Sequence, residues 1–167
     1  MTKQEAYNRI KSYFSLPGTT FGWDEEDGSC VYVARDGARC AIGVLIPEKE
    51  AFDELAKMCH GGVTSLTETL SYEMNRTDGY NYDPRISRAA RRLYDMLGLG
   101  DKSMIDFYQG CQRIHDRHAE AFATQYVSKY SMDTTSVTPI LGVDLTEAKA
   151  NMLRDLAIFA SDEGLVA

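Results

Sequence analysis

Residues 29–47, SCVYVARDGARCAIGVLIP, decide the fold class. Two runs rich in Val, Ile, Tyr and Cys, residues 29–34 and 38–46, lie on either side of a turn that contains Asp36-Gly37. Asp-Gly between β-prone runs is a strong hairpin signal, because Gly accepts the positive φ that the turn requires. The second run is apolar at consecutive positions, which is typical of a strand buried on both faces. We therefore expect a β-hairpin here.

The length of this turn decides which hairpin residues share a face. A two-residue turn places Cys30 and Cys40 on opposite faces of the hairpin. A three-residue loop with Gly37 at a bulge brings both thiols to one face, on a diagonal. In either register, small buried hydrophobic side chains are the simplest interpretation of the two cysteines. Gly43 lacks a side chain and favours the close approach of another backbone or helix.

Helical periodicity surrounds the hairpin. Thr2-x-x-Glu5 forms a capping-box pattern, and Asp83-Pro84 pairs an N-cap with a first-turn proline. The apolar spacing predicts helices over about residues 2–16, 48–60, 63–74, 83–97, 101–126 and 144–159. The fold class is therefore α+β: a mostly helical single domain over residues 1–167, with about six helices packed around the hairpin and one extra strand as an open alternative.

The composition excludes several classes of protein. The chain has 167 residues, of which 44% are hydrophobic and 26% charged, close to the averages of globular domains. No apolar run approaches the ~20 residues of a membrane span, and we expect no signal peptide and no membrane partner. A net charge of −7 argues against general nucleic-acid binding. Four cysteines without a secretory signal indicate free thiols and a cytoplasmic location.

The predicted helix that begins at Asp101 carries a candidate metal site. Cys111, His115 and His118 follow one another at i, i+4 and i+7, so they share a helical face and could hold a transition metal. A fourth ligand would have to come from another part of the chain. Zinc sites usually show two close pairs of ligands, a pattern that this sequence lacks. Histidines packed at the edge of an amphipathic stripe are the simpler interpretation, and we expect no cofactor.

A second interpretation of the same helix is nucleophilic catalysis. Cys40, His115 and Asp116 could act as the nucleophile, base and orienting carboxylate of a cysteine-dependent hydrolase or transferase. Neighbouring residues of a helix point about 100° apart, so Asp116 is not expected to orient the imidazole of His115. A thiol in an apolar strand also has a raised pKa and low reactivity. The sequence contains no Gly-rich nucleophile elbow and no P-loop.

An arginine-rich segment locally reverses the charge of this acidic chain. The candidate ligand- or partner-binding residues are Arg76, Tyr80, Tyr82, Arg85, Arg88 and Arg92. The last three arginines fall on one face of the predicted helix 83–97, and the tyrosines could stack on a base while the arginines bind phosphate. Ion pairs with Asp83 and Asp95 on a solvated helix face are the alternative interpretation.

Two short motifs resemble those of a known group of proteins. Residues 40–47 read Cys-Ala-Ile-Gly-Val-Leu-Ile-Pro, and residues 112–116 read Gln-Arg-Ile-His-Asp. Together with Cys30, this pattern resembles that of small, uncharacterised bacterial and bacteriophage proteins, which carry a Cys, a hairpin, Cys-Ala-x-Gly-x-Leu-Ile-Pro and a helix with Gln-x-x-His-Asp. Members often have another Cys where this chain has Val44. The resemblance implies an intracellular accessory protein of the kind that phages encode, and it implies no catalytic residue.

These observations favour a non-enzymatic cytoplasmic binding protein. Its expected partner is a host protein or a small anionic, phosphate-bearing ligand, bound at the arginine-rich segment. The alternatives that stay open are a cysteine-dependent enzyme using Cys40 and His115, and a zinc-stabilised structural module. Self-association into a homo-oligomer also stays open.

Overall fold

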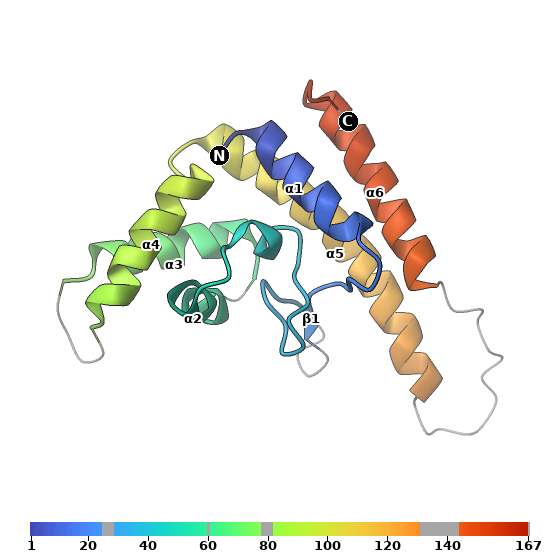
Figure 1. The fold of residues 1–167 in the computed structure, drawn as a ribbon, viewed down its shortest axis with the longest axis horizontal. Coiled ribbons are helices and arrows are strands. Elements are labelled where there is room, and N and C mark those ends of the chain that lie inside the picture. Colours follow the sequence, from blue (N-terminus) through green and yellow to red (C-terminus); the bar gives the residue numbers. More distant parts are fainter. Residues whose placement is uncertain (25–28, 60, 78–81, 131–143, 167) are drawn as a thin grey trace.

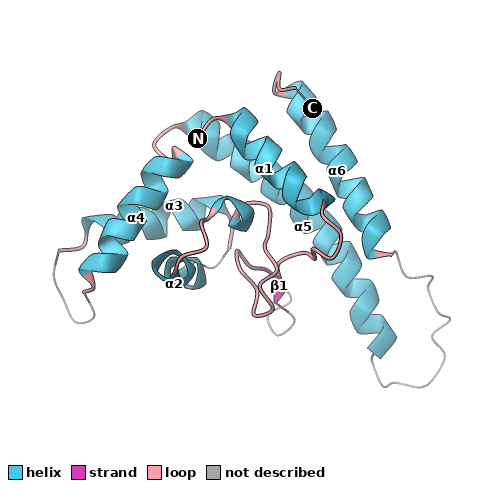
Figure 2. Ribbon diagram, viewed as in Figure 1, coloured by secondary structure: helices cyan, strands magenta, loops and turns pink. Residues whose placement is uncertain are grey.

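Helices make up most of the structure, a computed structural model that describes residues 1–24, 29–59, 61–77, 82–130 and 144–166, with the backbone alone for residues 123–130. The helices are α1 (Lys3–Ser15), α2 (Glu50–Met58), α3 (Val63–Asn75), α4 (Pro84–Leu97), α5 (Lys102–Tyr130) and α6 (Leu145–Asp162) (Figure 1). Two short strands, β1 (Trp23–Asp24) and β2 (Ser29–Cys30), and a 3-10 helix, η1 (Gly43–Leu45), lie between α1 and α2 (Figure 2). The predicted class, a mostly helical α+β fold, is confirmed.

Local capping signals set the starts of α1 and α4. The Thr2 side chain accepts a hydrogen bond from the amide of Glu5, and the Glu5 carboxylate accepts one from the amide of Thr2, which completes the predicted capping box. Asp83 caps α4 with Pro84 in its first turn, as predicted. At the other end of α4, Gly98 adopts a left-handed conformation with φ 68°, which glycine reaches without a Cβ penalty.

The helices pack as two groups. α6 contacts both α1 and α5, the ring of Phe14 on α1 packs against His115 on α5, and α4 contacts both α2 and α3 (Figure 1). The two groups meet where α3 contacts α5. The short helix η1, just before α2 in the chain, contacts α1. The Tyr108 hydroxyl on α5 also donates to the carbonyl of Leu97 at 2.9 Å, at the end of α4. The buried hydrophobic side chains of the described residues form one cluster that includes members of all six helices. None of the described helices is long and apolar enough to cross a bilayer.

The paired strands of the structure lie earlier in the chain than the predicted pair. The antiparallel pair is β1 with β2, and Trp23 faces Cys30. The prediction of a strand over residues 38–46 is wrong, because within it only Arg39 makes isolated bridges and the chain then turns into η1. The buried guanidinium of Arg39 donates to the carbonyls of Gly43 and Ile46 at 2.9 and 3.1 Å. These bonds satisfy carbonyls that a strand would offer to a neighbour.

The three-residue loop is the register that the structure adopts. The Ala34 amide donates to the carbonyl of Ala38 at 2.8 Å, and the Gly37 amide donates back to Ala34 at 3.0 Å. Gly37 has φ 86°, the left-handed conformation that the bulge requires. The expected close approach at Gly43 is also confirmed, because a Cβ added there would overlap the backbone carbonyl of Tyr32.

Candidate functional site

A cavity of about 500 Å³ lies between α2 and α4. We call it the arginine pocket; its lining residues are Lys49, Ala51, Phe52, Arg85, Arg88, Ala89 and Arg92. Its volume lies within the roughly 300–1,000 Å³ that is typical of small-molecule sites. Phe52 and Ala89 are buried and supply apolar lining, whereas Lys49, Arg88 and Arg92 are exposed. The pocket therefore combines apolar walls with four cationic groups.

Helical spacing places three of these cations together. Arg85, Arg88 and Arg92 follow at i, i+3 and i+7 of α4, so they form a row along one face. The adjacent face of α4 carries buried side chains such as Ile86 and Leu93, which anchor the helix in the core. The helical period that places the apolar side chains of α4 in the core therefore also places its arginines along the pocket. Lys49 enters from the N-cap position of α2.

The charges in the arginine pocket are only partly compensated. Arg85 binds the carboxylate of Asp83 at 2.8 Å, and the hydrogen bonds from Arg85 hold the pKa of Asp83 below its usual value. Within the described ranges, no carboxylate lies within 4.0 Å of the charged atoms of Lys49, Arg88 or Arg92. Three cations at one cavity are thus available to an anion from solution.

The structure divides the predicted arginine and tyrosine set. Arg85, Arg88 and Arg92 line the pocket, whereas Arg76 and Tyr82 do not. Arg76 pairs with Glu73 at 3.5 Å at the end of α3. Tyr80 lies outside the described residues. Three lining residues, Lys49, Ala51 and Phe52, were not predicted, because they lie at the start of another helix and no local pattern links them to the arginines.

A second cluster of reactive side chains forms where β2 meets α5. The Cys30 Sγ lies 3.6 Å from the Nδ1 of His115, and the Asp116 Oδ1 lies 3.1 Å from the same nitrogen. Asp116 therefore does reach the imidazole, contrary to the expectation from helix geometry, because its carboxylate folds back toward His115. We call these three residues the Cys30 cluster. In the sequence Cys30 belongs to the predicted hairpin, and no local pattern links it to His115 or Asp116.

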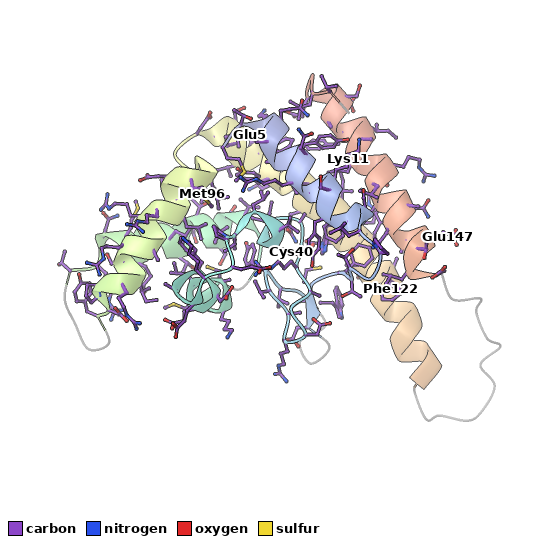
Figure 3. All side chains as sticks on the ribbon, in the orientation of Figure 1. Glu5, Lys11, Cys40, Met96, Phe122 and Glu147 are labelled. Atoms are coloured by element: carbon purple, nitrogen blue, oxygen red, sulfur yellow. The ribbon has the colours of Figure 1, made fainter. Side chains whose placement is uncertain are left out.

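The predicted nucleophile Cys40 occupies a different environment. Its thiol lies in the segment between α1 and α2, in the middle of the molecule (Figure 3). The Cys40 Sγ accepts a hydrogen bond from the Gly43 amide at 3.3 Å, and burial raises its pKa to about 12. In the part of the chain with described side chains, the thiol that contacts His115 is that of Cys30. The proposed pairing of Cys40 with His115 is not assembled.

The contacts of His115 do not form a catalytic relay. In such a relay the nucleophile bonds one ring nitrogen and the carboxylate bonds the other. Here Cys30 and Asp116 both contact Nδ1, and the buried Nε2 has no hydrogen-bond partner among the described residues. The rings of Phe14 and Phe21 have their centres 5.5 and 5.2 Å from that of the imidazole. Burial lowers the pKa of His115 and raises that of Cys30.

The predicted metal ligands Cys111, His115 and His118 do not converge. The His118 Nε2 lies 2.9 Å from the Asp155 carboxylate, which belongs to α6. Cys111 is buried, and burial raises its pKa to about 12. Across the described side chains, the group with ligand atoms all within 4.8 Å of one another is the Cys30 cluster. Residues two turns apart share a helical face but are too far apart along the helix axis for their side chains to meet at one point.

No protein-family model, curated protein or solved structure matches this chain. Its function is therefore inferred from the chemistry of its own residues.

Proposed function

We propose that this protein is a non-enzymatic binding protein that holds a small anionic, phosphate-bearing ligand in the arginine pocket. The observation that carries the proposal is the set of three cations, Lys49, Arg88 and Arg92, that lie at one cavity without a carboxylate partner among the described residues. Arginine binds phosphate through two parallel hydrogen bonds, which gives both strength and orientation. A phosphate group matches this chemistry better than a carboxylate, since it carries more charge and more acceptor oxygens.

The apolar lining favours a ligand with more than a phosphate group. Phe52 and Ala89 offer a surface on which a flat or aliphatic portion can pack while the cations bind the charged end. The hydrogen bond and charge of Asp83, and less strongly the charges of Glu54 and Glu50, raise the pKa of Arg85. Arg85 is therefore already partly neutralised, and the anionic group of the ligand is expected toward Arg88 and Arg92. The resemblance to small bacterial and bacteriophage proteins supports an accessory role in the cytoplasm.

Binding of adenosine monophosphate and of inorganic phosphate, measured by isothermal titration calorimetry on the full chain, tests this proposal. The double substitution Arg88→Glu with Arg92→Glu should abolish the binding and leave the circular dichroism spectrum unchanged. Each charge-assisted hydrogen bond contributes about 1.5–3 kcal/mol, so each arginine removed should weaken binding by at least about tenfold.

The matched control is Arg113→Glu with Arg117→Glu. These exposed arginines have the same i, i+4 spacing on α5, and the double substitution changes the net charge equally. Wild-type protein that binds neither probe, or equal weakening by both pairs of substitutions, would contradict the proposal. Another outcome is that the protein binds an acidic polypeptide such as polyglutamate but neither probe, and that the Arg88→Glu and Arg92→Glu substitutions abolish this binding. The expected partner would then be a protein and not a small ligand.

A further inference from the structure

The Cys30 cluster joins three types of metal ligand at one point. Cys30 comes from β2, and His115 and Asp116 are neighbours on α5, so a contact across 85 residues of sequence brings the thiol to the imidazole. The Sγ, Nδ1 and carboxylate oxygen all lie within 4.8 Å of one another. In a hydrogen-bonded relay the partners lie on opposite sides of the imidazole, whereas here both face the same ring nitrogen. Donor atoms that converge in this way suit a cation at their centre.

The distances fit a tetrahedral zinc ion. Zn–S and Zn–N bonds of about 2.3 and 2.0 Å at a tetrahedral angle place the sulfur and nitrogen about 3.5 Å apart. The same construction places the nitrogen and the carboxylate oxygen about 3.3 Å apart. The corresponding distances here are 3.6 and 3.1 Å. These two separations differ from those of a tetrahedral zinc site by about 0.1 and 0.2 Å, and the Cys30 Sγ and the Asp116 carboxylate oxygen lie within 4.8 Å of each other.

A neighbouring residue already orients the carboxylate. The buried Gln112, one turn before Asp116 on α5, donates a hydrogen bond to the Asp116 Oδ1. The Gln112 Oε1 in turn accepts the amide of Ile42 at 3.4 Å, which ties this side chain to the segment before η1. Metal-binding carboxylates are commonly held by such outer hydrogen bonds.

We infer that Cys30, His115 and Asp116 form a binding site for a zinc-type divalent cation. The inference is independent of the arginine pocket and goes beyond the sequence-based expectation of no cofactor. A thiolate and an imidazole select zinc over magnesium or calcium, which prefer oxygen ligands. The Asp116 side chain is 44% exposed, so the ion reaches the site from solvent without unfolding of the core.

The test is zinc binding by the full chain after removal of metal with a chelator. Competition against a chromophoric chelator should show one tightly bound equivalent of Zn²⁺, confirmed by elemental analysis. Substitution with Co²⁺ should produce a thiolate-to-cobalt charge-transfer band and the intense visible absorption of tetrahedral cobalt. Absence of stoichiometric zinc, or a cobalt spectrum without the thiolate band, would overturn the inference.

Two ligand variants locate the ion. Cys30→Ser and Asp116→Asn each remove one ligand and leave the fully buried His115 in place. Loss of a residue that only orients a ligand weakens metal binding by up to about 100-fold, so loss of a ligand itself should weaken zinc binding by at least that factor. The controls are Cys111→Ala, a buried thiol on the same helix, and Glu120→Gln, an exposed carboxylate one turn after Asp116. Both controls should retain wild-type affinity. Equal affinity in all four variants would place the zinc elsewhere and refute the site.

Discussion

Replacement of Gly43 by alanine tests the packing of the segment that precedes α2. A Cβ at this position would lie 2.7 Å from the carbonyl carbon and 3.1 Å from the Cα of Tyr32, in addition to its overlap with the carbonyl oxygen. These are backbone atoms, so no side-chain rotation relieves the clash. Overpacking of this kind costs about 1–3 kcal/mol, and a backbone clash belongs at the upper end. The lower chain entropy of alanine in the unfolded state offsets about 0.4–1 kcal/mol.

The expected net effect is a loss of about 2 kcal/mol in the free energy of unfolding. For a domain of this size that corresponds to a fall of roughly 4–8 °C in Tm, measurable by calorimetry or by urea titration. The control is Gly100→Ala, since a Cβ there meets only the ring edge of Tyr94 at 3.9 Å. That variant should match or slightly exceed the wild-type stability. A Gly43→Ala protein within about 0.5 kcal/mol of wild type would refute the proposed clash, because surface substitutions without such features fall in that range.

Two further predictions concern ionisable groups. Cys40, Cys59 and Cys111 are buried, with pKa values raised by burial to about 12, 11 and 12, so iodoacetamide near neutral pH should label them only after denaturation. Rapid labelling of any of them in the folded protein, detected by mass spectrometry, would contradict the buried environment. The hydrogen bonds from Arg85 lower the pKa of Asp83, so its stabilisation of α4 should be complete above about pH 4 and lost as the pH falls through the lowered pKa. If NMR showed that Asp83 titrates at its ordinary pKa, this prediction would be wrong. In the Asp83→Asn variant, the part of the acid-induced loss of stability that is due to Asp83 should disappear.

The arginine pocket shows how far local patterns reach. The spacing of Arg85, Arg88 and Arg92 along one helix was sufficient to predict that they share a face, because α-helical geometry depends only on position in the chain. That this face borders a cavity depends on α2, which contributes Lys49 and Phe52. Their side chains reach the arginines only through the packing of α2 on α4, which no periodicity within either helix encodes.

The Cys30 cluster shows where local patterns fail to predict a site. Sequence reasoning identified His115 and Asp116 but favoured Cys40 as the thiol and expected Asp116 to point away. The choice between the thiols depends on the turn after Ala34 and on the chain path after Arg39. The buried guanidinium of Arg39 directs that path by binding two carbonyls, which is a tertiary contact. Strand propensity alone therefore predicted a second strand where the chain turns into η1.

The sequence by itself indicated the helices through their period, and a capping box or an N-cap aspartate marked the starts of α1, α4 and α6, because these signals act between residues a few positions apart. It also determined the sign and spacing of the charges on α4. Only the tertiary structure decided which thiol meets His115 and which helix completes the arginine pocket. Those contacts join residues tens of positions apart, and their geometry depends on how several elements pack together at once.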